Sequence, residues 1–129
     1  MFPTVPTLTV MTLEWEQVVV DAHDPRALGR WWAEALGWAV VDDSPDEYEI
    51  RPAPDRLPGL LFGRSPDGKA GKNRLHLDFR PVDQRAEVER LLALGARHAD
   101  VGQSGDEPWV VLADPEGNEF CVLGPRRQS

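Results

Sequence analysis

The chain carries the same set of local signals twice, and this internal repeat restricts its fold more than any other feature. An aspartate precedes each of two predicted helices, at Asp24 and Asp83, and a Leu-Gly pair ends each of them, at Gly37 and Gly95. Aspartate is a preferred N-cap and glycine a preferred helix stop. The two starts lie 59 residues apart and the two stops 58 residues apart. The spacing predicts a duplicated structural unit.

Each unit reads as one strand, one helix and a group of strands, a βαβββ pattern. The apolar side chains of the first helix recur at the i, i+3, i+4 spacing of one buried face. They are Leu28, Trp31, Trp32, Ala35 and Leu36. We predict an α+β fold in one domain over residues 1–129, with repeat units at about 13–64 and 73–124, because 129 residues suit a single core.

Charge and cysteine content narrow the classes of partner. The net charge of −8 argues against nucleic acid or an anionic membrane as a partner. No apolar run approaches the ~18 residues that a membrane helix needs, and residues 1–12 do not resemble a signal peptide. A single cysteine, Cys121, cannot form an intrachain disulfide. A reducing, cytoplasmic location is therefore expected.

The last predicted hairpin, residues 109–123, carries the most specific sequence motif. Alternating apolar residues flank the turn Asp114-Pro-Glu-Gly-Asn118. The segment resembles the final hairpin of the vicinal oxygen chelate superfamily, which includes glyoxalases, extradiol dioxygenases, fosfomycin-modifying enzymes and bleomycin-binding proteins. Residues 24–37, with the pair Trp31-Trp32, resemble its first helix, and residues 72–79 resemble its fifth strand. The nearest resemblance is to the glyoxalase-like and bleomycin-resistance branch.

The resemblance implies that the strands curl into one curved mixed sheet around a ligand cavity, with helices outside and a homodimer as the assembly. Metal-dependent members hold a divalent ion with His, Gln and Glu side chains from several strands. Carried over by position, this chain offers Gln17, His76 and Cys121, and its fourth strand, residues 60–63, offers no carboxylate. Since cysteine replaces the usual glutamate, we expect no metal and no cofactor.

Strand alternation sorts the remaining candidates onto the concave face. The predicted ligand-binding residues are Trp15, Gln17, Phe62, His76, Trp109, Val111 and Cys121. Trp15 has a dimer contact as its competing explanation. His76 has two interpretations, a general base or ligand hydrogen-bonding group, or a structural member of a polar network with Asp78. For Cys121, an apolar filler is favoured over a nucleophile.

Two functions from different classes follow. The first is metal-independent binding of a small, aromatic molecule, as in bleomycin-binding proteins, because aromatic planes on the concave face stack on flat ligands. The alternative is a lyase or isomerase of the glyoxalase type that is either metal-dependent or uses His76 as its catalytic residue. The fold does not decide between them. Whether the protein is an enzyme stays open on sequence alone.

Overall fold

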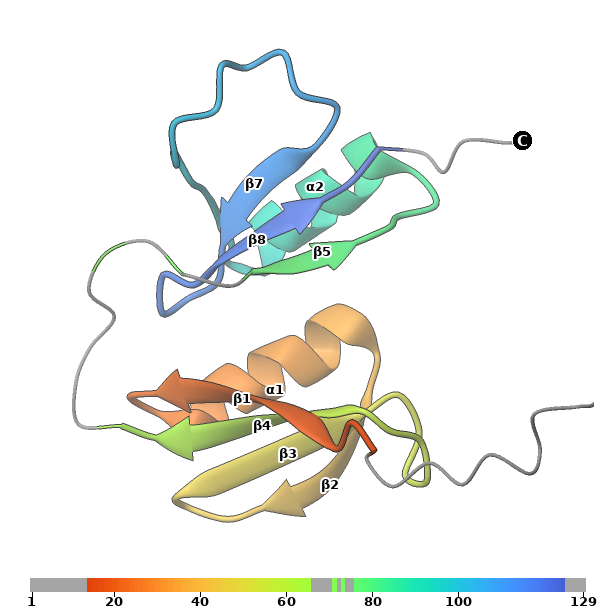
Figure 1. Cartoon of the computed structure of the whole chain (residues 1–129), viewed down its shortest axis with the longest axis vertical. Coiled ribbons are helices and arrows are strands. Elements are labelled where there is room, and N and C mark those ends of the chain that lie inside the picture. The colour runs from red at the N-terminus through yellow and green to blue at the C-terminus, as the bar shows by residue number, and fades with distance from the viewer. Residues whose placement is uncertain (1–13, 66–70, 72, 74–75, 125–129) are drawn as a thin grey trace, which may run out of the picture.

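A computed structural model of the chain describes residues 14–65, 71, 73 and 76–124. Each unit contains four strands and one helix (Figure 1). The first unit comprises β1 (Gln17–Ala22), α1 (Pro25–Leu36), β2 (Ala39–Asp43), β3 (Glu47–Arg51) and β4 (Gly59–Arg64). The second comprises β5 (Leu77–Phe79), α2 (Gln84–Leu94), β6 (Arg97–His98), β7 (Val110–Ala113) and β8 (Glu119–Val122). Residues 1–12, predicted as a lead-in, lie outside the described residues.

The two helices begin and end where the sequence predicts. The Asp24 side chain accepts a hydrogen bond from the Ala27 N–H at 3.1 Å, and Asp83 accepts one from Ala86 N–H at 3.1 Å. Each carboxylate thereby satisfies a backbone donor that has no partner within its helix. Gly37 ends α1 at φ 69°, a left-handed conformation in which a residue with a Cβ is strained.

Strand pairing is the same in both units. The strand orders are β1-β4-β3-β2 and β5-β8-β7-β6, and in each sheet the first strand runs parallel to the last. The predicted α+β class is confirmed, and the strands form two four-stranded mixed sheets, one in each unit. The predicted strand at 73–80 pairs only over Leu77–Phe79; residues 74 and 75 are outside the described part of the chain.

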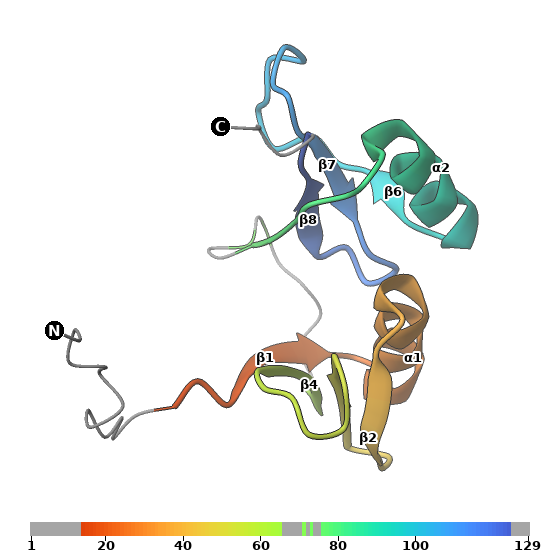
Figure 2. The same ribbon diagram turned by 90° about the vertical axis from the view of Figure 1, so that its right-hand side faces the viewer.

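Helix α1 joins the two units. Figure 2 shows both helices on one side of the molecule, with α1 next to the second unit. Trp32 is 3% exposed, and its ring centroid lies 4.9 Å from Phe120 and 5.6 Å from Phe79, both in the second sheet. Its indole N–H donates to the buried Asp114 carboxylate at 3.0 Å. The predicted core role of the tryptophan pair is therefore confirmed for Trp32, which packs against the other unit.

The turn of the last hairpin also contacts the first unit. The Glu116 carboxylate accepts hydrogen bonds from the backbone N–H groups of His23 and Asp24 at 2.8 and 3.0 Å. Asp114 holds the turn itself by accepting from the N–H groups of Glu116 and Asn118, each at 2.9 Å. The sequence motif of this hairpin thus determines both a turn and a contact between the two units. Within the described residues, neither helix is both long and apolar enough to cross a membrane.

Candidate functional site

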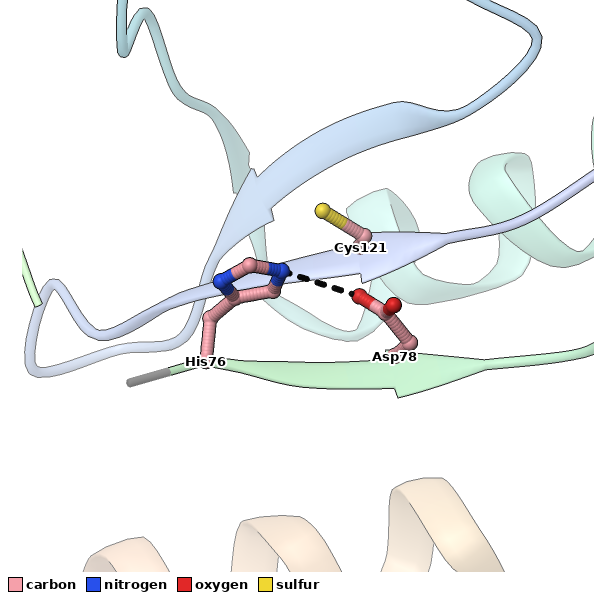
Figure 3. A group of neighbouring side chains, drawn as sticks. All are labelled: His76, Asp78 and Cys121. Carbon is pink, nitrogen blue, oxygen red and sulfur yellow. Dashed lines mark ion pairs between the residues drawn. The ribbon is translucent and has the colours of Figure 1, made fainter. Parts of the chain in front are cut away.

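Three side chains of types that often act in catalysis or ligand binding converge on the open face of the second sheet (Figure 3). His76 and Asp78 stand two residues apart, so both point to one side of their strand. Asp78 is paired directly with Cys121 of β8. The His76 Nε2 atom lies 3.1 Å from Asp78 Oδ1, and one ligand atom from each of the three residues lies within 4.8 Å of the others. The backbone register therefore brings His, Asp and Cys together.

A hollow of about 310 Å³ opens above this cluster. We call it the Trp109 hollow. Its lining comprises Asn73, His76, Asp78, Val101, Trp109, Val111, Glu119, Phe120, Cys121 and Leu123. Val111 pairs with Cys121 across β7 and β8, and both are buried, whereas Trp109 is 41% exposed. Trp109, Val111 and Cys121, which alternation predicts to share a face, all line this hollow.

A second, larger hollow of about 660 Å³ lies between the units. We call it the Trp15 hollow, because Trp15, 65% exposed, lies on its wall together with Phe62. Both hollows are bordered by Asn73, His76, Glu119 and Phe120. The two spaces therefore adjoin at His76, and a ligand in one would lie near the other.

Two members of the predicted binding set are placed differently. Gln17 of β1 lines neither hollow, so it does not form a common floor with His76 and Cys121. Phe62 is 0% exposed and belongs to the hydrophobic core. It borders the Trp15 hollow without presenting a surface, because β4 is covered by α1 and by its neighbouring strands. The contribution of Phe62 to ligand binding therefore stays a prediction.

The metal-ligand positions implied by the superfamily resemblance do not fit a metal ion in this chain. Gln17 lines neither the Trp109 hollow nor the Trp15 hollow, and β4 contributes Leu60, Leu61 and Phe62 where a carboxylate would be needed. Of the implied positions, those whose side chains lie near one another are His76 and Cys121, which both belong to the second unit and cannot by themselves provide an ion shared by both units. No step of the proposals below passes through such a shared ion.

Three polar residues of the Trp109 hollow are absent from the predicted ligand-binding set: Asn73, Asp78 and Glu119. The i, i+2 spacing of His76 and Asp78 is a usable sequence signal for Asp78. Asn73 donates from its backbone N–H to Glu119 Oε1 at 3.0 Å and from its side chain to the Glu119 carbonyl at 3.2 Å. That contact depends on tertiary structure and has no local sequence signal.

The loop that leads into Trp109 is held by a carboxylate. Glu107 accepts hydrogen bonds from the backbone N–H groups of Ser104 and Gly105 at 2.7 and 3.0 Å. The pKa of Glu107 is lowered from its ordinary value, chiefly by the bond from the Ser104 N–H, because these donors favour the ionised form. At neutral pH the ionised Glu107 carboxylate thus holds this loop, which leads to the Trp109 wall of the Trp109 hollow.

Comparison with solved structures shows the same fold in proteins of low sequence identity. A glyoxalase/bleomycin resistance protein/dioxygenase family enzyme from Burkholderia phytofirmans PsJN is 20% identical, with a TM-score of 0.64, over 85% of this chain and 97% of that one. The antibiotic binding protein TnmS3 from Streptomyces sp. CB03234 is 19% identical, with a TM-score of 0.63, over 91% and 100%.

A third similar structure is the bleomycin-binding protein from Streptomyces verticillus complexed with copper(II)-bleomycin. It is 17% identical, with a TM-score of 0.60, over 91% of this chain and 100% of that one. At these identities the likeness establishes the fold. No curated protein matches the sequence.

A family match covers most of the chain. Residues 17–123 match the family described as "Glyoxalase-like domain". This range contains both units, the Trp109 hollow and the cluster of His76, Asp78 and Cys121, together with the lining of the Trp15 hollow apart from Trp15 itself. The chain therefore belongs to the glyoxalase-like domain family, within the vicinal oxygen chelate superfamily.

Proposed function

We propose that this protein binds a small, planar aromatic molecule in the Trp109 hollow, and that this binding needs no metal ion. The observation that carries the proposal is the half-exposed Trp109 ring above a floor formed by the buried Val111 and Cys121. A mostly apolar hollow of about 310 Å³ with a few polar groups at one side has the usual make-up of a small-molecule site.

Polar groups at the edge of the hollow would orient the ligand. His76, Asp78 and Asn73 lie on one side and can exchange hydrogen bonds with a bound heteroatom. The larger Trp15 hollow would extend the site for ligands with a second ring. Two structurally similar proteins are a bleomycin-binding protein and an antibiotic binding protein, which supports the same class of ligand here.

Calorimetric titration against a panel of aromatic metabolites and antibiotics tests the proposal. Trp109→Ala should weaken binding by a few-fold to about tenfold, since aromatic stacking contributes roughly 0.5–1.5 kcal/mol. A chelator should leave the affinity of the wild type unchanged. For one-ring ligands, which do not reach the Trp15 hollow, Trp15→Ala is the matched control, because it removes an exposed ring from the other hollow. Equal affinity in wild type and Trp109→Ala would refute the proposed site.

The contact between His76 and Asp78 favours one second candidate, a lyase or isomerase that uses His76 as its catalytic base. A carboxylate 3.1 Å from Nε2 can orient the imidazole ring toward a bound ligand. Turnover of a bound ligand would appear as a new mass in the reaction mixture. His76→Ala should abolish that turnover and retain binding if the role is catalytic.

We further propose that both units act as a single domain and that the protein works in the reducing cytoplasm. We also propose that it forms a homodimer through the exposed face of β1. Val19 of β1 is 56% exposed and Trp15, two residues before the strand, is 65% exposed, although apolar side chains of this size are usually covered. Sedimentation of the wild type and of Val19→Glu tests the assembly. A dimer that the charge converts to monomer supports the proposed face, and a wild-type monomer contradicts it.

A further inference from the structure

We propose that Gln84, the first residue of α2, is a positioning residue that holds Trp109 in place at the wall of the Trp109 hollow. Gln84 itself does not line the hollow. The inference rests on the proposed aromatic binding, because it concerns the ring that is proposed to stack on the ligand. It also gives the N-terminal turn of α2 a role in ligand binding, although this helix buries only Leu91.

Trp109 depends on its backbone for a fixed position. It is 41% exposed and directly precedes β7, at the end of the loop that spans residues 99–109. A residue exposed to this extent has few packed neighbours that restrain its side chain. The direction in which the ring leaves the chain is then set by the adjoining peptide groups. A contact that fixes the peptide group between Pro108 and Trp109 therefore helps to fix the ring.

Gln84 binds that peptide group and an inner strand of the second sheet with one amide nitrogen. Its Nε2 atom donates to the Pro108 carbonyl oxygen at 2.8 Å and to the Val122 carbonyl oxygen at 3.1 Å. An amide nitrogen carries two hydrogens, so both bonds form together. Val122 of β8 is also the strand partner of Val110. The sheet thus fixes the residue after Trp109, and Gln84 fixes the residue before it.

The fold prepares both sides of this contact. Gln84 starts from a defined point, because the Asp83 side chain caps α2 by accepting from the Ala86 N–H at 3.1 Å. On the other side, Gly124 leaves room for the Pro108 carbonyl group. A Cβ atom on Gly124 would lie 3.1 Å from that oxygen, which is tighter than ordinary van der Waals contact. Two separate features therefore allow the Pro108 oxygen to reach the Gln84 amide.

The loop itself has few attachments to the rest of the molecule. In the described part of the chain, two hydrogen bonds join it to other elements. The Ala99 N–H donates to the Val111 carbonyl oxygen at 3.1 Å at its start, and Gln84 donates to Pro108 at its end. The remaining bonds are local, such as that from Gln103 Nε2 to the Ala99 carbonyl oxygen at 2.7 Å. Of the two attachments, the one from Gln84 lies beside Trp109.

The variant Gln84→Glu tests the contact without shortening the side chain. A glutamate carboxylate has no amide hydrogens, so both bonds are lost, whereas a negative charge in the first turn favours the helix. With every tryptophan replaced by 5-fluorotryptophan, Trp109→Phe identifies the fluorine resonance of Trp109. In Gln84→Glu that resonance should shift and broaden, because the ring samples more orientations. Arg85→Gln, at the neighbouring exposed position, is the matched control and should leave the resonance unchanged.

Binding is measured by calorimetric titration with 4-hydroxybenzamide, a planar one-ring probe. Gln84→Glu should weaken its binding by about two- to fivefold, and by less than Trp109→Ala does, because Gln84 acts through the ring. In a Trp109→Ala background the same substitution should have no further effect. An unchanged Trp109 resonance in Gln84→Glu would overturn the proposal, as would an equal loss of affinity in that background.

The two proposals can fail separately. If Trp109→Ala binds the probe as tightly as the wild type does, aromatic stacking at this hollow fails, and the fluorine resonance still decides whether Gln84 holds the ring. If Trp109→Ala weakens binding while the resonance is unchanged in Gln84→Glu, the hollow stands and Gln84 has no positioning role.

Discussion

The two units have the same strand order but differ sharply in what their open faces carry. In the first unit, Val19 of β1 and the preceding Trp15 are exposed, and on β3 the carboxylate of Glu49 is held by the Arg51 guanidinium at 2.8 Å. In the second unit, His76 and Asp78 lie beside a buried thiol within a hollow. The two copies thus share topology and caps, whereas the cluster of His, Asp and Cys side chains lies in one copy.

The helices differ in a second way. Helix α1 buries five of its residues and contacts strands of its own sheet while Trp32 reaches the other sheet. Helix α2 buries only Leu91. Since apolar burial is the main source of stability, α1 should carry more of the folding free energy than α2.

The largest expected effect tests that difference at equivalent positions. Trp32→Ala should lower the free energy of unfolding by about 3–5 kcal/mol, the usual cost of truncating a buried aromatic ring. It also removes the donor to Asp114. Leu91→Ala, 59 residues further on in α2, should cost less, near the lower end of the ~2–5 kcal/mol range. Urea denaturation measures both. An equal or larger loss for Leu91→Ala would remove the contrast between the helices.

The next effect concerns the repeated caps. Asp24→Ala and Asp83→Ala should each cost about 1 kcal/mol, because each leaves one backbone N–H without its acceptor. If the units form a single domain, both variants shift one cooperative transition that fluorescence and circular dichroism report at the same midpoint. Two separate transitions in Asp83→Ala would show that the second unit unfolds alone.

A similar magnitude applies to the two exposed tryptophans. Trp109→Ala should reduce the affinity of an aromatic ligand by roughly 0.5–1.5 kcal/mol. Trp15→Ala should reduce it less, unless the ligand extends into the larger hollow. Calorimetry with one-ring and two-ring ligands separates these cases. A greater loss in Trp15→Ala for one-ring ligands would move the site to the space between the units.

The sequence predicts the repeat and its helices well because those features depend on local chemistry. A capping aspartate and a terminal glycine act within a few residues, and alternation predicts the shared face of Trp109, Val111 and Cys121, which line one hollow. The burial of Phe62 could not be predicted by alternation, because both faces of its strand are apolar. The position of Gln17 relative to His76 depends on how the two sheets meet. Only tertiary packing determines that arrangement.

The smallest expected effect lies in the loop before Trp109 and depends on pH. The folded state lowers the pKa of Glu107, so its contribution to loop order is fully present above the ordinary glutamate value of 4.5 and is lost as pH falls through the lower, folded value. Because this carboxylate is fully exposed, global stability should hardly change.

The local amides should respond instead. Hydrogen exchange at the Ser104 and Gly105 N–H groups should quicken in Glu107→Gln at neutral pH, relative to the base-catalysed rate expected from sequence. Glu89→Gln, an exposed glutamate on α2, is the matched control. If Ser104 and Gly105 stay equally protected in Glu107→Gln, the charge does not order this wall, and Trp109 owes its position to other contacts.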